Sequence, residues 1–358
     1  MKYSAILFSI LALLCGRSFA AEKPNVLFII VDDLTTTLTC MGNPSVHTPH
    51  MDALAARGVR FDHAYTQFAL CNPSRCSFLT GCYPERTKVF DLVTSLRGGL
   101  PKEVTLPQFF KNRGYVTGRI GKVFHVADPN TKLDVQLGAA LSKDTALFED
   151  AKAENDPDDK PHGKAKGEGF NRSWAASSKP DSEFTDHQIA SDAISTLEQF
   201  KDKPFFLAVG FIRPHTPYIA PKPYFDAIDK SKLVLPSFYR EGGEDVSKMP
   251  LSSLRPNNNV FRYAAPTLDE ARDAMQAYLA ATSFVDAQVG RVLAKLTEMH
   301  LEENTIVLLT GDHGYQLGEH GLWAKQTLFE GGTHVPLIIA APGVKPGVRE
   351  GLVEQVDI

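Results

Sequence analysis

The chain of 358 residues has few cysteines and no excess of basic residues. Its 38 Lys and Arg stand against 42 Asp and Glu, which gives a net charge of −4. Nucleic-acid binding needs a basic face, so this balance indicates no nucleic-acid partner. Five cysteines in a chain of this length do not make a disulfide framework. A hydrophobic core must therefore hold the fold, and the length suits one large α/β domain or a domain and a half.

Long apolar runs are also lacking, and the first run is too short to cross a membrane. Ile6–Leu14 falls below the roughly 20 apolar residues that a transmembrane helix needs. It follows Lys2 and precedes the small-x-small stretch Ser18–Ala20, which is typical of a secretory signal peptide over residues 1–20. We therefore expect no transmembrane segment and an exported chain, periplasmic or secreted, with a bacterial-type signal.

The mature domain would cover residues 21–358. Cleavage would remove Lys2 and Arg17 and leave 36 basic against 42 acidic residues, a net charge of −6. An anionic substrate would then have to be met by a local basic pocket. A lipoprotein signal at Cys15 is the less favoured alternative, because the large Leu14 precedes it where a small residue is expected.

Continuous apolar runs bounded by turn residues predict strands that are buried on both faces. Such runs cover residues 25–31, 204–210, 305–310 and 335–341, and residues 115–120 are a further predicted strand. Helical spacing predicts four helices, the last with room for one break: residues 49–57, 105–113, 186–200 and 268–301. This alternation predicts a doubly wound α/β fold, with a mostly parallel sheet sandwiched by helices. Residues 128–183, rich in Asp, Lys, Gly and Pro, are interpreted as a solvated surface excursion, with a substrate-facing loop as the alternative.

Acids, histidines and a lysine follow four of the predicted strands. They are Asp32, Asp33, Lys122, His125, His215, Asp312 and His313. Sites in open α/β sheets form at the carboxyl ends of strands, so we expect these side chains to converge. Three carboxylates would repel one another there unless a cation joins them. Oxygen ligands favour a hard ion, Ca²⁺ before Mg²⁺. Taken singly, an Asp-Asp pair after a strand is more often a helix cap or a solvated turn.

The segment Cys71–Gly81 reads Cys-Asn-Pro-Ser-Arg-Cys-Ser-Phe-Leu-Thr-Gly. It resembles the motif Cys-x-Pro-Ser-Arg-x-x-x-Leu-Thr-Gly of type I sulfatases, with every fixed position filled, so a merely buried thiol is the weaker interpretation. The resemblance implies an alkaline-phosphatase-like sulfatase fold and a sulfuric ester hydrolase. It implies that a formylglycine-generating maturation enzyme oxidises Cys71 to formylglycine, whose hydrated aldehyde is the nucleophile. Cys40, Cys76 and Cys82 would remain after cleavage and conversion; at least one stays unpaired, and the sequence does not determine their pairing.

The same resemblance implies a metal site. One calcium ion would be held by Asp32, Asp33, Asp312 and His313, with an oxygen of formylglycine at position 71 and a sulfate oxygen completing the shell. A sulfate monoester is a stable anion that water attacks poorly. A hydroxyl of the hydrate, acidified by the metal, would attack sulfur in line, and the second hydroxyl would then eject sulfate.

Five further side chains are candidate catalytic residues. Arg75 lies one helical turn beyond the formylglycine position and can hold the metal cluster. Lys122 and Lys325 would neutralise sulfate oxygens. His125 is a candidate base for the hydrate, and His215 is a candidate acid for the leaving oxygen. Either lysine could instead be an ordinary surface residue, and His215 could merely order a turn between two prolines.

Three segments carry a narrower resemblance, to the iduronate-2-sulfatase branch. They are Gly121–His125, Val209–Tyr218 and Gly311–Lys325. In this branch a histidine, here His313, stands where many sulfatases have asparagine. The expected substrate is therefore a sulfated saccharide, with a 2-O-sulfated uronic acid as the finer hypothesis.

Two other interpretations remain open. Phosphomonoester and phosphonate hydrolases belong to the same superfamily, and some also use a formylglycine. An inactive, truncated relative is the second, because the family continues past a segment like Gly351–Ile358 into a smaller C-terminal antiparallel subdomain. We accordingly expect a C-terminally truncated catalytic domain over 21–358, with no partner for residues 344–358. Four apolar side chains would then be exposed: Leu337, Ile338, Leu352 and Val353.

Overall fold

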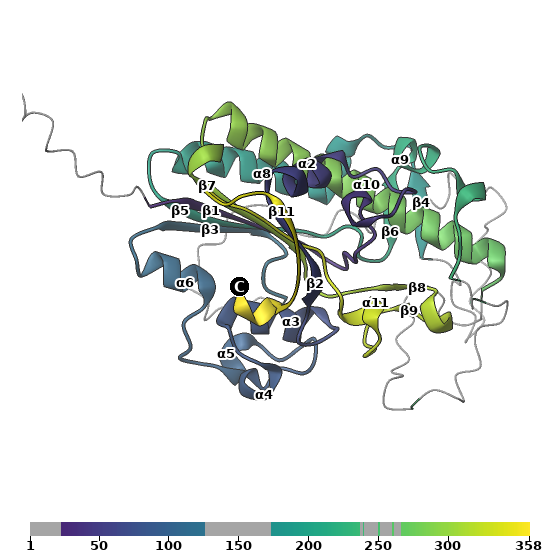
Figure 1. The fold of residues 1–358 in the computed structure, drawn as a ribbon, viewed down its shortest axis with the longest axis horizontal. Coiled ribbons are helices and arrows are strands. Elements are labelled where there is room, and N and C mark those ends of the chain that lie inside the picture. The colour runs from purple at the N-terminus through teal and green to yellow at the C-terminus, as the bar shows by residue number, and fades with distance from the viewer. Residues whose placement is uncertain (1–22, 126–172, 237–238, 240–249, 251–259, 261–265) are drawn as a thin grey trace, which may run out of the picture.

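The computed structural model describes residues 23–125, 173–236, 239, 250, 260 and 266–358. Its centre is a seven-stranded sheet in the order β11-β2-β10-β7-β1-β5-β3 (Figure 1). The strands are β1 (Asn25–Val31), β2 (Val59–Tyr65), β3 (Val116–Gly121), β5 (Phe205–Phe211), β7 (Thr305–Gly311), β10 (Leu337–Ala340) and β11 (Gly347–Glu354). Only β10 runs against its neighbours, so the sheet is mostly parallel, as predicted.

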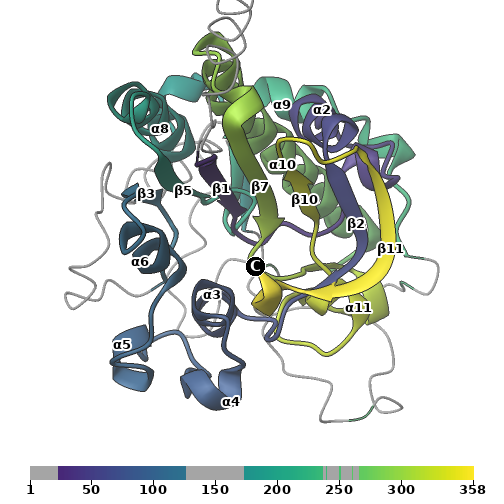
Figure 2. The same ribbon diagram turned by 60° about the vertical axis from the view of Figure 1, so that its left-hand side comes forward.

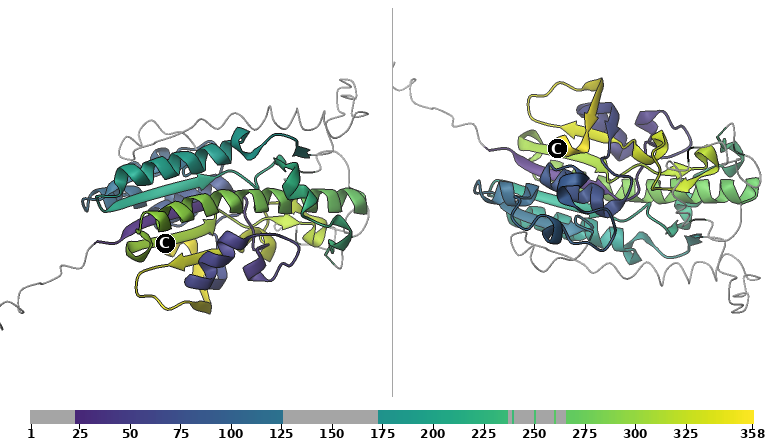
Figure 3. Two further views of the ribbon diagram at one scale, coloured as in Figure 1. Left: turned by 90° about the horizontal axis from the view of Figure 1, so that it is seen from above. Right: turned by 90° about the horizontal axis from the view of Figure 1, so that it is seen from below.

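Helices cover both faces of this sheet (Figures 1, 2 and 3). On one face lie α2 (Pro49–Arg57), α8 (Thr185–Phe200) and α10 (Leu268–Glu298); on the other lie α3 (Cys71–Thr80) and α6 (Leu106–Lys111). The alternate side chains of β1 show why the strand is apolar throughout. Leu27 and Ile29 pack with the α8 and α10 side chains, whereas Phe28 and Ile30 pack with α3. Burial on two faces is the expected origin of a continuous apolar run.

The remaining elements are short and lie around the sheet. They are the helices α4 (Pro84–Thr87), α5 (Leu96–Gly99), α9 (Lys222–Asp226) and α11 (Glu330–Thr333), the strand pairs β4 (Trp174–Ser177) with β6 (Tyr218–Pro221) and β8 (Gln316–Leu317) with β9 (Trp323–Ala324), and the 3₁₀ helices η1 (Thr39–Met41), η2 (Asp181–Glu183), η3 (Lys230–Lys232), η6 (Glu302–Asn304), η7 (Glu319–Gly321) and η8 (Gln355–Asp357). Within the described ranges, no helix has both the length and the apolar character needed to span a bilayer.

The long helix α10 is continuous, so the break that the sequence allowed is absent. Thr267 and Glu270 cap its start reciprocally: the Thr267 hydroxyl accepts from the Glu270 amide at 3.2 Å, and the Glu270 carboxylate accepts from the Thr267 amide at 3.0 Å. Most of the predicted excursion 128–183 lies outside the described residues. Its last part is ordered into β4 and η2, so that end is structured rather than a plain solvated loop.

The prediction that residues 344–358 lack a partner is wrong. β11 pairs in parallel with β2, and η8 packs beside α3. Leu337 and Ile338 are also buried, because β10 lies between β2 and β7. Of the four apolar side chains expected to be exposed, Leu352 is 73% exposed and Val353 is partly buried. The sequence does not predict β11 as a strand, because an edge strand with charged residues has little apolar character.

Candidate active site and metal centre

Two neighbouring strands deliver four of the polar side chains. β1 and β7 pair in parallel with Val31 opposite Gly311, so the residues after each strand emerge side by side. Asp32 and Asp33 follow β1, and Asp312 and His313 follow β7. All four are buried. The Asp33 amide donates to Asp312 Oδ1 at 3.0 Å, which ties the two strand ends together.

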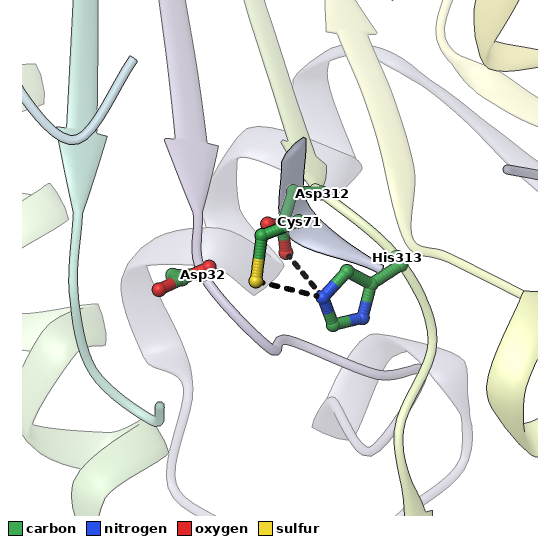
Figure 4. A group of neighbouring side chains, drawn as sticks. All are labelled: Asp32, Cys71, Asp312 and His313. Carbon is green, nitrogen blue, oxygen red and sulfur yellow. Dashed lines mark hydrogen bonds and ion pairs between the residues drawn. The ribbon is translucent and has the colours of Figure 1, made fainter. Parts of the chain in front are cut away.

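Cys71, the first residue of α3, lies between these side chains (Figure 4). Its Sγ is 3.3 Å from His313 Nε2 and 4.0 Å from Asp33 Oδ1. The ligand atoms of Asp32, Cys71, Asp312 and His313 all lie within 4.8 Å of one another. Asp33 Oδ2 is buried without a hydrogen-bond partner in the described structure. A buried, converging donor set in which one carboxylate oxygen accepts no hydrogen bond fits a cation.

Three cationic side chains surround the acids. Arg75 is fully buried and donates to Asp32 Oδ1 at 3.1 Å and to Asp312 Oδ2 at 2.9 Å. Lys122 also pairs with Asp32. Such charge-assisted pairs fix the orientation of a carboxylate as well as its charge. Arg75 thereby joins α3 to both strand ends.

Lys325 is the third cation and reaches residue 71 directly. It is 3% exposed, pairs with Asp33 and donates to Cys71 Sγ at 3.0 Å. Burial alone would raise the pKa of the Cys71 thiol, but Lys122, Lys325 and His313 lower that pKa well below its ordinary value. Position 71 is therefore built to hold a negatively charged atom, and the sulfur marks where an oxygen of formylglycine would lie.

Lys122 owes its place to a close approach of two strands. Gly121 ends β3 with φ +68°, and a Cβ there would collide with the carbonyl oxygen of Gly210 on β5. Only glycine tolerates this left-handed, crowded conformation without strain. The Lys122 amide then donates to Gly210 O at 2.8 Å, which fixes the turn that aims its side chain at Asp32.

The two candidate acid–base histidines lie at the edge of this cluster. His215 Nδ1 bonds the Thr216 carbonyl at 2.7 Å, and its Nε2 lies 4.0 Å from Asp33 Oδ2. With 28% of its side chain exposed, His215 stands between the buried acids and solvent. His125 is close enough to Cys71 to favour the thiolate. The structure thus brings the other nine predicted site residues together around Cys71, while the catalytic roles of all ten stay predictions.

Sequence reasoning missed two polar side chains that hold the metal-site loops. The Tyr278 hydroxyl, from the middle of α10, donates to the Asp33 carbonyl at 2.7 Å and accepts from the Thr35 amide at 3.0 Å. Gln355 donates to the Gly311 carbonyl at 2.6 Å. It also donates to Thr310 Oγ1 at 2.9 Å. Neither belongs to a local motif, so only the fold reveals them.

A family model described as Sulfatase matches residues 24–358. The chain belongs to the sulfatase family. Iduronate 2-sulfatase of Homo sapiens is 35% identical over 333 residues, which is 89% of this chain and 60% of that protein. A sulfatase of Formosa agariphila is 34% identical over 339 residues, covering 92% of this chain and 66% of that protein. The predicted family and its similarity to iduronate 2-sulfatase are thus confirmed.

The structure has the alkaline-phosphatase-like fold of the sulfatases. A phosphonate monoester hydrolase from Silicibacter pomeroyi superimposes with a TM-score of 0.75 at 25% identity, over 93% of this chain and 71% of that one. This sulfatase-family chain spans about 60% of the length of the iduronate 2-sulfatases that it matches.

Proposed function

We propose that this sulfatase-family chain hydrolyses sulfate monoesters of saccharides, with a formylglycine made from Cys71 as the nucleophile. The observation that carries the proposal is the position of Cys71. It lies at the start of a buried helix, between the metal-ligand cluster and Lys325. A side chain held there would face both a cation bound by this cluster and an anionic ester beside Lys325.

Charge balance supports an anionic substrate. Asp32, Asp33 and Asp312 supply three negative charges, and Arg75, Lys122 and Lys325 supply three positive ones. A divalent cation would therefore leave the buried cluster with a surplus of about two positive charges, counting His313 as neutral. Such a surplus in a region of low dielectric would bind an anion strongly.

The residues present divide the chemical work. Bound calcium, favoured over Mg²⁺ by the oxygen-rich set, would polarise the ester and acidify a formylglycine hydroxyl. Arg75 orients the carboxylates of two ligands, while Lys122 and Lys325 hold sulfate oxygens. His125, beside residue 71, would accept a proton from the hydrate. His215, at the solvent edge, would give a proton to the leaving oxygen, since sugar alkoxides leave poorly.

Substrate class and location complete the proposal. The 35% identity to iduronate 2-sulfatase supports a 2-O-sulfated uronic acid as the finer hypothesis. A formylglycine-generating enzyme would be the maturation partner, and no nucleic-acid partner is expected. The proposed signal peptide, residues 1–20, lies outside the described structure, and export to the periplasm or beyond rests on the sequence alone.

The decisive experiment combines mass and turnover. The full chain, co-produced with a formylglycine-generating enzyme, should show the mass of an aldehyde or its hydrate in the peptide around residue 71, and should release sulfate from saccharide sulfates. Cys71→Ala should abolish turnover. Cys76→Ala, in the same helix, removes another buried thiol and should leave the chemistry largely intact. Active enzyme that carries only unmodified Cys71 would refute the nucleophile.

A phosphonate or phosphate ester hydrolase is the second candidate, favoured by the similarity to the Silicibacter pomeroyi enzyme. Side-by-side kcat/KM values on matched sulfate, phosphate and phosphonate esters separate the two functions. A higher kcat/KM on the phosphate or phosphonate ester than on the sulfate ester would move the assignment to that class.

A further inference from the structure

The unconverted Cys71 thiol completes a donor set of mixed chemical character. Figure 4 shows the His313 ring facing the Cys71 sulfur and the Asp312 carboxylate, with Asp32 on the other side of the thiol. Sγ and Nε2 are 3.3 Å apart, and all four ligand atoms lie within 4.8 Å of one another. The set therefore offers one sulfur, one nitrogen and two carboxylate oxygens in a buried space.

This set differs from one that calcium prefers. Calcium takes oxygen ligands, whereas zinc is bound by thiolate sulfur, imidazole nitrogen and carboxylate oxygen, four at a time. Thiolate ligands select zinc-like ions over hard ones. Conversion of Cys71 to formylglycine would replace the only sulfur donor of this set with oxygen. One covalent change thus alters the metal preference of the whole site.

We propose that the unconverted chain binds Zn²⁺, or Co²⁺ in its place, through Cys71 Sγ, His313 Nε2 and the carboxylates of Asp32 and Asp312. Conversion to formylglycine ends this preference and leaves a site for a hard cation. The second part rests on the proposed function, since it presumes that Cys71 is converted. A zinc-loaded chain would be folded and inactive, distinct from the calcium-loaded enzyme.

The surrounding contacts orient these donors for a tetrahedral ion. Zinc–ligand bonds of about 2.0–2.3 Å place neighbouring ligand atoms roughly 3.5 Å apart, close to the separation already found between Sγ and Nε2. His313 Nδ1 bonds the Gly314 carbonyl at 2.8 Å, which leaves Nε2 to bind the metal. Arg75 fixes both carboxylates, and Lys325 stabilises a thiolate at 3.0 Å.

Cobalt titration tests the inference without any turnover assay. The full chain is produced without a formylglycine-generating enzyme, the Cys71 thiol is verified by peptide mass, and metal is removed with a chelator. Added Co²⁺ should give a thiolate-to-cobalt charge-transfer absorption that saturates at one ion per chain. Zn²⁺ should erase the band at stoichiometric amounts, whereas a hundredfold excess of Ca²⁺ should leave it.

Two variants locate the sulfur. Cys71→Ser should lose the band and bind Zn²⁺ at least tenfold more weakly, while Cys76→Ser, five residues further along α3, should keep both the band and the affinity. No band, a band that survives Cys71→Ser, or a band lost in Cys76→Ser would overturn the proposal. If Cys71→Ser does not fold, X-ray absorption of the zinc-loaded wild type replaces it. A sulfur shell at about 2.3 Å supports the site, and a shell of nitrogen and oxygen only refutes it.

These outcomes are separable from those of the proposed function. If the converted chain hydrolyses sulfates but the unconverted chain gives no cobalt absorption band, the zinc site is refuted and the proposed function is not. If the unconverted chain gives a clear cobalt band but co-production with a formylglycine-generating enzyme yields neither formylglycine nor turnover, the sulfatase mechanism is refuted and the zinc site is not.

Discussion

Asp286 should make the stability of this protein fall as the pH rises from about 4 to 7. This α10 residue is 1% exposed and caps the start of α2, accepting from the Met51 amide at 2.8 Å and the His50 amide at 3.2 Å. Burial raises its pKa from 3.8 to about 7; the two amides oppose the shift and Asp52 adds to it. The folded state therefore holds the proton more tightly than the unfolded chain does.

The sign and size of the effect follow from linkage. The stability that neutral Asp286 supplies is fully present below about pH 4 and is lost as the pH rises through about 7. A pKa difference of roughly three units corresponds to on the order of 4 kcal/mol over this window. In a chain of this size each kcal/mol moves Tm by about 2 °C. The neutral variant Asp286→Asn, which keeps an acceptor for the Met51 amide, should lack this loss.

The measurement is the difference in unfolding free energy between Asp286→Asn and wild type from pH 4 to 8, at one fixed metal concentration because bound ions also shift Tm. We expect this difference to move in favour of the variant by a few kcal/mol, or about 5–10 °C in Tm, across the window. Asp202→Asn, at an exposed turn, is the matched control and should track wild type. Parallel pH curves for wild type and Asp286→Asn would show that Asp286 is ionised in both states and refute the reasoning.

Three further predictions concern the site. Asp312→Asn should weaken calcium binding and cut turnover by several orders of magnitude, as loss of a Lewis-acid site does; full activity after exhaustive chelation would contradict the metal assignment. His215→Ala should lose far more kcat on a saccharide sulfate than on an aryl sulfate, whose phenolate needs little protonation, whereas His125→Ala should affect both alike; equal losses for His215→Ala would remove it as the acid. Gln355→Leu should lower the unfolding free energy by about 1–3 kcal/mol, because its two buried hydrogen bonds, to the Gly311 carbonyl and to Thr310 Oγ1, are lost, and should weaken calcium binding; Gln67→Leu, which removes a partly buried amide that bonds Glu354, should do neither.

The parts of the fold that the sequence predicts are those with a local cause. The sequence predicts β1, β5 and β7 because strands covered on both faces need continuous apolar runs, and it predicts the site because the polar residues follow those strands. The sequence does not predict β11 or the contact of Gln355. β11 forms because it pairs with β2, and Gln355 bonds the Gly311 carbonyl, and both partners are far away in the sequence. The contact of Tyr278 cannot be predicted from the sequence either. A tyrosine on a buried helix face is typical of a core residue, and only the fold places its hydroxyl beside the Asp33 carbonyl.

The burial of Cys71 has a consequence for the order of events during folding. The residue is 1% exposed, and two of the side chains that contact its sulfur come from far along the chain: Lys325 is 254 residues away and His313 is 242 residues away. Such contacts form late, because the entropy of closing long loops must be met before they stabilise anything. While the chain is still open, the segment after Leu70 is accessible to a modifying enzyme; once β7 and Lys325 have docked, it is not. Conversion of Cys71 would therefore have to occur before folding buries the residue. A mutation that speeds folding would then lower the fraction of chains that carry formylglycine, without changing any catalytic residue.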